Sequence, residues 1–130
     1  MKRRLPPAER LLTRAELELM AILWSLEEAS VAEVIDRLPR SRDVAYTTVS
    51  TILRILEDKG FVVSRKEGRS HLYSPRVSKE SYETKSLKQL VNKVFDGAPS
   101  ALIRRLLDEN ALSRDEIREI QAMLNKRSRS

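Results

Sequence analysis

The hydrophobic period of the sequence changes abruptly at Gly60, and this change restricts the fold more than any other feature. The segment from Tyr46 to about Lys59 has helical period, and its apolar residues share one side: Val49, Ile52, Leu53 and Leu56. After Gly60, "FVVSRK" and "HLYSP" are β-branched and aromatic, and they flank "EGR" at residues 67–69. This pattern predicts a two-stranded hairpin with Gly68 in its turn. A helix that ends on a glycine and runs directly into a hairpin is therefore expected.

Three other segments share a helix-start signature. In each, a Ser or Thr hydroxyl and a Glu three residues later satisfy backbone N–H groups reciprocally. The signatures are Thr13–Glu16, Ser30–Glu33 and Ser113–Glu116, and helical periodicity follows each one. Together with the other periodic segments they predict six helices, at about 14–26, 31–38, 46–59, 79–95, from Pro99 onward, and 114–126.

The order of these elements is three helices, a hairpin and three further helices. This predicts a mostly α fold with a small β-hairpin (α+β), whose first part is a winged helix-turn-helix. The best boundary lies at Pro75–Ser78, which divides a domain of residues 1–76 from a helical domain of residues 77–130. The later helices carry apolar stripes formed by Leu87, Leu90, Val91, Val94, Leu102, Ile103, Leu106, Leu107, Ile117, Ile120 and Leu124.

Composition excludes several classes of function. Hydrophobic residues make up 41% of the chain and charged residues 34%, a folded and soluble profile. No run of 18 apolar residues predicts a membrane span, and "MKRRLPPAER" does not resemble a secretory signal. The lack of cysteine fits the cytoplasm and excludes disulfides and thiolate metal sites. We therefore expect a cytoplasmic protein without cofactor or metal.

Catalytic chemistry finds little support in the sequence. His71 is the only histidine, it lies in a predicted strand, and no glycine-framed nucleophile accompanies it. We interpret His71 as a polar strand residue and expect no enzyme. The acidic residues Glu27 and Glu28 lie at a helix end and are interpreted as solvated.

The side of the 46–59 helix opposite its apolar residues is unusual, because it gathers short hydroxyl side chains around one arginine. Such side chains let a helix lie close to a surface and donate hydrogen bonds to phosphates or base edges. An arginine there is suited to a bidentate contact with guanine or to holding a phosphate. An ordinary solvated helix face remains the alternative interpretation. The candidate major-groove contacts are Thr47, Thr48, Ser50, Thr51 and Arg54, with Tyr46 suited either to the core or to the mouth of the groove.

The hairpin tip is basic, and this favours the nucleic-acid interpretation. Arg65, Lys66 and Arg69 lie within five residues, opposed only by Glu67. A charged hairpin tip is often only a soluble edge. Here it follows a candidate recognition helix directly, where a wing would meet flanking phosphates. The net charge of +6 agrees with an anionic partner.

The chain resembles the penicillinase-repressor family (the BlaI/MecI type, with the copper-responsive CopY branch) over about residues 11–126. "LTRAELELMAILW" fits its first helix, and "VFDGAPSALIRRLLDENALSRDEIREIQAML" looks like its C-terminal dimerisation region. The family pattern of the recognition helix and wing is matched by Ala45, Tyr46, Thr47, Thr48, Val49, Thr51, Leu53, Leu56, Lys59, Gly60, Tyr73 and Pro75.

This resemblance implies a homodimeric transcriptional repressor. The winged helix of residues 1–76 would bind a palindromic double-stranded DNA operator, and the apolar stripes of residues 77–130 would join the protomers. In β-lactam-responsive members a sensor protease cuts an Asn–Phe bond, and this position corresponds to Arg105–Leu106 here. Both residues are changed, so a regulatory protease acting here would differ in preference. The absence of cysteine rules out the copper-responsive branch's thiolate motif.

A protein-interaction module is the alternative function, with the 46–59 helix or the wing docking an acidic protein. A well-folded dimer without salt-sensitive duplex binding would indicate it.

Overall fold

The structure is a computed structural model that describes residues 11–39 and 43–129. The chain forms two compact units, Met1–Leu87 and Lys88–Ser130. The division falls inside helix α4 (Lys79–Val94), later than the 76/77 boundary suggested by the sequence. The difference arises because Tyr82 packs in the first unit, where its hydroxyl accepts the Leu12 N–H at 2.9 Å. The functional roles assigned to the two parts of the chain stay predictions.

The three helices of the first unit are α1 (Arg14–Leu26), α2 (Val31–Arg37) and α3 (Tyr46–Asp58). The predicted capping boxes at Thr13 and Ser30 are both present, so α1 and α2 begin where the sequence placed them. Helix α3 ends at Asp58, and Gly60, with a φ of 87°, turns the chain two residues later. The N–H of Phe61 then reaches the carbonyl of Leu56 at 2.9 Å, which closes the helix end and starts the hairpin.

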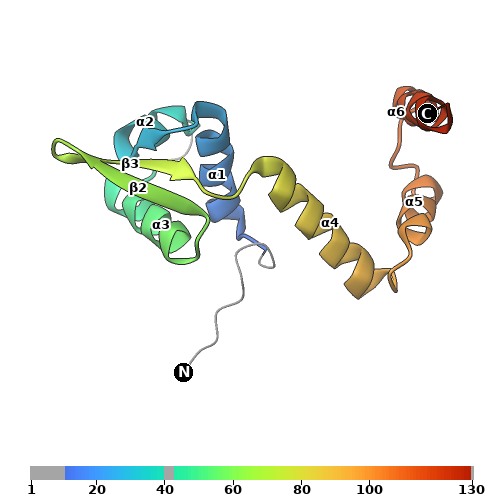
Figure 1. The fold of residues 1–130 in the computed structure, drawn as a ribbon, viewed down its shortest axis with the longest axis horizontal. Coiled ribbons are helices and arrows are strands. Elements are labelled where there is room, and N and C mark those ends of the chain that lie inside the picture. Colours follow the sequence, from blue (N-terminus) through green and yellow to red (C-terminus); the bar gives the residue numbers. More distant parts are fainter. Residues whose placement is uncertain (1–10, 40–42, 130) are drawn as a thin grey trace. The chain divides into compact units, whose positions relative to one another are not determined.

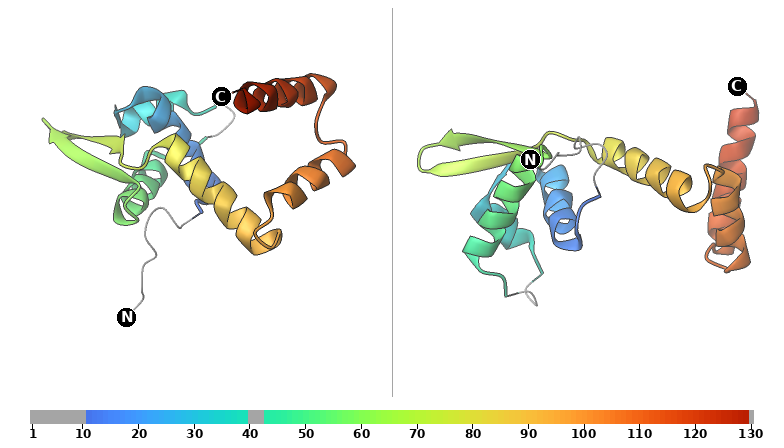
Figure 2. Two further views of the ribbon diagram at one scale, coloured as in Figure 1. Left: turned by 45° about the vertical axis from the view of Figure 1, so that its right-hand side comes forward. Right: turned by 90° about the horizontal axis from the view of Figure 1, so that it is seen from below.

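A small antiparallel sheet completes this unit. Its strands are β1 (Ala29–Ser30), β2 (Val62–Glu67) and β3 (Ser70–Pro75), in the order β1-β3-β2. The predicted two-stranded hairpin is therefore incomplete, since β1 pairs with β3 at its other edge. A strand of two residues is too short to show a period of its own. The β2–β3 hairpin projects past the ends of the helices (Figures 1 and 2).

The core of the first unit lies between the three helices and the sheet. Helix α3 contributes Val49, Leu53 and Leu56, which are fully or almost fully buried. Each such side chain stabilises the fold by roughly 1.5–3 kcal/mol relative to exposure. The other completely buried large side chains are Met20, Leu23, Val34, Phe61 and Val62. Burial of one side of α3 directs its opposite side to solvent.

Trp24 and Tyr82 join the start of α4 to this core. The indole N–H of Trp24 donates to the carbonyl of Val77 at 2.9 Å, and the ring centroids of Trp24 and Tyr82 are 5.9 Å apart. Tyr82 also meets Phe61 edge to face at 6.1 Å. Trp24 is partly buried against the core, and its indole N–H reaches the segment after the hairpin.

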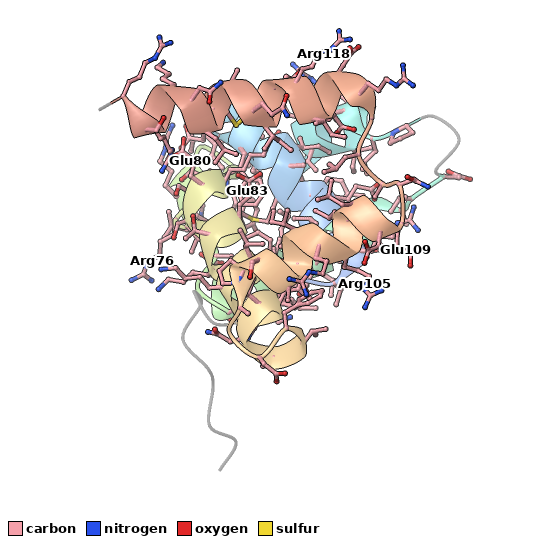
Figure 3. All side chains as sticks on the ribbon, turned by 90° about the vertical axis from the view of Figure 1, so that its right-hand side faces the viewer. Arg76, Glu80, Glu83, Arg105, Glu109 and Arg118 are labelled. Carbon is pink, nitrogen blue, oxygen red and sulfur yellow. The ribbon has the colours of Figure 1, made fainter. Side chains whose placement is uncertain are left out.

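The second unit contains the end of α4 and the helices α5 (Pro99–Asp108) and α6 (Arg114–Ser128). Gly97, with φ of 76°, donates its N–H to the Val91 carbonyl and ends α4. A third capping box starts α6 at Ser113, as predicted. The structure describes every residue of α5 and α6, and none of them is buried. Arg105 and Glu109 extend away from α5 (Figure 3).

Helix α3 is held at its C-terminal end by a nearly buried ion pair. Glu16 is 5% exposed, and one carboxylate oxygen accepts the Thr13 N–H at 2.9 Å. The other accepts from Lys59 Nζ at 2.6 Å. Burial alone would raise the pKa of Glu16, but hydrogen bonds from Lys59 and Thr13 outweigh burial and leave the pKa below its ordinary value. One carboxylate therefore caps α1 and positions α3.

We predict that Glu16→Gln lowers the free energy of unfolding by about 2 kcal/mol at neutral pH, since a charged hydrogen bond is lost. The lowered pKa means that this stabilisation is present above the unfolded pKa of Glu and is lost as pH falls through the folded pKa. Urea unfolding across acidic pH should thus bring the variant and wild type together. Glu83→Gln, on an exposed position of α4, is the control. A constant difference down to acid pH would contradict the account.

Candidate nucleic-acid interface

The exposed side of α3 carries the residues that the sequence selected. Tyr46 is 59% exposed, which excludes the core alternative for it. Thr47, Thr51 and Arg54 are exposed, and Ser50 is partly buried. The structure therefore places these side chains on the side of α3 opposite its buried residues, as the sequence predicts.

The structure separates one of these residues from the others. Thr48 lies beside an apolar pocket of about 200 Å³ lined by Leu19, Leu38, Val49 and Ile52. It therefore occupies the flank of α3 that faces α1 and α2, away from the hairpin.

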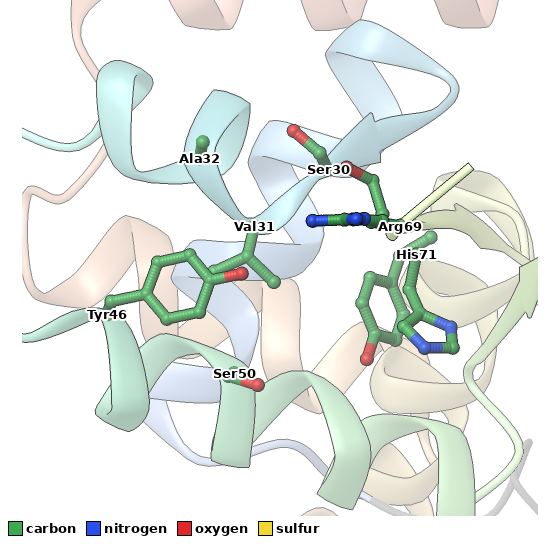
Figure 4. A pocket seen from close by; sticks show the side chains of 9 residues that line it. Ser30, Val31, Ala32, Tyr46, Ser50, Arg69 and His71 are labelled. Carbon is green, nitrogen blue, oxygen red and sulfur yellow. The ribbon is translucent and has the colours of Figure 1, made fainter. Parts of the chain in front are cut away.

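A polar trough runs between α3 and the hairpin. Its larger part has a volume of about 380 Å³ and is lined by Ser50, Arg54, Glu57, Ser64, His71 and Tyr73. A smaller part, about 150 Å³, shares three of these residues and adds Tyr46, Arg69 and the start of α2. Figure 4 shows the side chains of Tyr46, Arg69 and His71 converging on this smaller part. The trough thus joins the hydroxyl-bearing helix to the basic wing.

The register of the hairpin decides which wing residues face the trough. Ser64 pairs with Tyr73, and Lys66 pairs with His71, so all four side chains lie on one face of the sheet. That face is turned to α3, because Ser64 donates to the Glu57 carboxylate at 2.5 Å and Tyr73 is buried. Arg65 lies on the other face.

The electrostatics of the trough follow from this packing. The pKa of Tyr73 is raised, first by burial and then by the negative charge of Glu57, while Arg54 opposes the shift. Arg54 and Glu57 therefore both act on the phenol. Within the part of the chain that the structure describes, no ion pair occupies Arg54, Lys66 or Arg69. These three cations remain available to an anionic ligand.

Two residues that the sequence analysis set aside belong to this region. His71 lines both parts of the trough. Its period-2 alternation with Tyr73 is the sequence signal that predicts a shared face for these two side chains. Glu28 is not simply solvated as interpreted from the sequence, because it forms a bidentate pair with Arg65 at 2.8 Å. No local pattern reveals this contact between residues 37 positions apart.

A helix-turn-helix followed by a projecting hairpin, with cations beside an exposed hydroxyl-rich helix, defines the winged-helix class of DNA-binding domains. Residues 12–126 match the family model of the penicillinase repressor, and the chain belongs to this family. It is thus a winged-helix member of a family of DNA-binding repressors, which are not enzymes.

Individual relatives agree with this assignment. The chain is 31% identical over 116 residues to the methicillin resistance regulatory protein MecI of Mammaliicoccus sciuri, covering 89% of this chain and 94% of that protein. It is 29% identical over 110 residues to the penicillinase repressor of Bacillus licheniformis, covering 85% and 86%. The DNA-binding domain of the repressor BlaI superposes with a TM-score of 0.51 at 30% identity, covering 62% of this chain and 94% of that domain.

No helix within residues 11–39 and 43–129 has the length and apolarity needed to cross a membrane.

Proposed function

We propose that this protein is a homodimeric, sequence-specific transcriptional repressor that binds a palindromic operator. One observation carries the proposal: the hydroxyl-and-arginine side of α3 is exposed next to a projecting basic hairpin. In this account α3 enters the major groove, where Thr47, Ser50, Thr51 and Arg54 meet base edges. Lys66 and Arg69 contact the phosphate backbone beside the groove.

The exposed edge of α3 is compatible with close approach to a duplex. Its hydroxyl side chains are short, so the helix backbone can lie near the bases, and Arg54 can reach further in. Tyr46 stands at the start of the helix, where its ring and hydroxyl suit the mouth of the groove. Because Thr48 lies on the flank turned to α1 and α2, its proposed contact is with the strand at the groove edge.

The second unit supports the proposal of a dimer. Of the eleven apolar residues proposed for dimerisation, only Val91 is buried, and four are partly buried: Leu102, Leu106, Ile117 and Ile120. The other six are exposed: Leu87, Leu90, Val94, Ile103, Leu107 and Leu124. Large apolar side chains left exposed in this way are typical of an interface. A two-fold pair would bury it and place two α3 helices on grooves roughly 34 Å apart, or a multiple of that.

Release of repression by a protease stays a prediction. The carbonyl of Arg105 accepts the N–H of Glu109 at 3.1 Å, and that of Leu106 accepts the N–H of Ala111 at 3.0 Å. Both residues lie within α5, so cleavage between them requires the end of this helix to open. A protease of this kind would have to accept Arg and Leu in place of the family's Asn and Phe.

The base-reading role of α3 predicts different effects for two substitutions. The probes are a duplex selected by wild type from a randomised library and a scrambled duplex of the same composition. Arg54→Ala should cost about 1–3 kcal/mol on the selected duplex and much less on the scrambled one. Lys66→Ala should weaken both similarly and reduce the salt slope by about one. Fluorescence anisotropy titrations measure both.

Equal losses on the two duplexes for Arg54→Ala would count against base reading. Duplex binding that salt does not weaken, by a folded dimer, would instead indicate a protein-interaction module.

The proposed dimer predicts that Ile103→Ser weakens self-association by about 2 kcal/mol, because an apolar side chain loses its burial in the interface. Arg104→Ser, at the neighbouring exposed position of α5, is the matched control and should leave association unchanged. Sedimentation velocity over a range of concentrations measures both. A wild-type protein that stays monomeric at every concentration, or an Ile103→Ser variant that dimerises like wild type, would contradict the proposal.

A further inference from the structure

Arg65 differs from the other cations of the wing in already having a carboxylate partner. Its Nε and one terminal nitrogen each lie 2.8 Å from an oxygen of Glu28, and the same terminal nitrogen is 3.3 Å from Glu67. Two parallel hydrogen bonds of this kind are stronger and more specific in geometry than a single ionic contact. The pair leaves the pKa of Glu28 lowered and that of Arg65 raised. A phosphate that approached this guanidinium would meet a cation whose Nε and one terminal nitrogen already bind Glu28.

Strand alternation also turns Arg65 away from the proposed DNA side. Ser64, the preceding residue, bonds to Glu57 of α3, so its neighbour Arg65 lies on the opposite face of β2. Arg65 stands opposite Leu72 of the central strand β3. Glu28 immediately precedes β1, which is paired to the far side of β3. The ion pair therefore crosses β3 and ties the outer edge strand of the wing to the opposite edge of the sheet.

The base of the wing is thus fixed from both faces by adjacent residues of β2. On the α3 side, the Ser64–Glu57 hydrogen bond joins two residues that line the trough. On the other side, the Arg65–Glu28 pair joins the hairpin to the residue that precedes β1. Lys66 and Arg69, further towards the tip, are left to meet an anion at a defined place.

We propose that Arg65 is a positioning residue, which with Glu28 sets the angle of the wing and does not itself neutralise a DNA phosphate. The inference rests on the proposed DNA binding and revises the backbone contact that the sequence suggested for Arg65. Its consequence is that wing charge and wing geometry are carried by different residues: Lys66 and Arg69 carry the charge, and Arg65 and Glu28 carry the geometry.

The dependence of duplex affinity on salt separates the two roles. Each phosphate contact contributes about 0.9 to the slope of log affinity against log salt. Arg65→Ala should leave the slope of wild type unchanged and lower affinity roughly twofold to fivefold at every salt concentration, the range for an exposed ion pair. Lys66→Ala is the matched variant on the neighbouring residue, and it should lower the slope. A slope reduced equally by Arg65→Ala would overturn the inference.

A substitution of Glu28 changes duplex affinity in opposite directions under the two roles considered for Arg65, positioning the wing and contacting a phosphate. If the pair positions the wing, Glu28→Gln weakens binding to the same extent as Arg65→Ala, whereas Glu67→Gln, which removes an equal charge with a weaker contact, does not. If Arg65 contacts phosphate, Glu28→Gln frees the guanidinium and strengthens binding. Tighter binding by Glu28→Gln than by Glu67→Gln would therefore contradict the positioning role.

A reversed pair provides the rescue. The double variant Glu28→Arg with Arg65→Glu rebuilds the ion pair and should recover wild-type affinity and slope on the library-selected duplex. A glutamate in a phosphate contact would instead make this the weakest binder of the set, which would overturn the inference. Should wild type show no salt-dependent duplex binding, the proposed function fails and this inference with it. If wild type binds the duplex in a salt-dependent way and Lys66→Ala lowers the slope, but the reversed pair does not recover affinity, this inference alone is wrong.

Discussion

The burial of Val49, Leu53 and Leu56 is the constraint on which the rest of the structure depends. An α-helix advances 100° per residue, so fixing these three side chains in the core fixes the outward direction of Thr47, Thr51 and Arg54 as well. The Glu16–Lys59 pair and the Gly60 turn then set where the helix ends and where the hairpin begins. The hydrophobic core thereby determines the direction of the polar side of α3.

The same separation of tasks extends to the wing. Its inner face is held to α3 through Ser64 and Glu57, and its outer face is held to the start of β1 through Arg65 and Glu28. Among the residues that the structure describes, Arg54 on α3 and Lys66 and Arg69 nearest the tip have no ion-pair partner. A duplex that approaches this surface would meet cations that need not first leave a carboxylate partner. The neighbouring ion pair and hydrogen bond already hold the strand that carries them, so less ordering is needed on binding.

Much of the fold was predictable because its signals are local. The capping boxes at Thr13, Ser30 and Ser113 and the change of period at Gly60 are short-range patterns, and each is confirmed. Strand β1 was missed because two residues cannot display a period. The Glu28–Arg65 pair was missed for another reason, since sheet register and chain crossing bring it about. Tyr82 likewise joins the first unit through aromatic contacts formed only in the folded chain.

The absence of cysteine from the chain permits a direct measurement of the central claim, that the outer side of α3 lies against DNA. A single thiol introduced by Thr51→Cys would report on that side of the helix, and one at Glu83→Cys on an exposed part of α4 as reference. The rate of maleimide labelling is measured with and without the library-selected duplex. The account predicts strong protection of position 51 by the duplex and none at position 83. Equal labelling of position 51 under saturating duplex would contradict it.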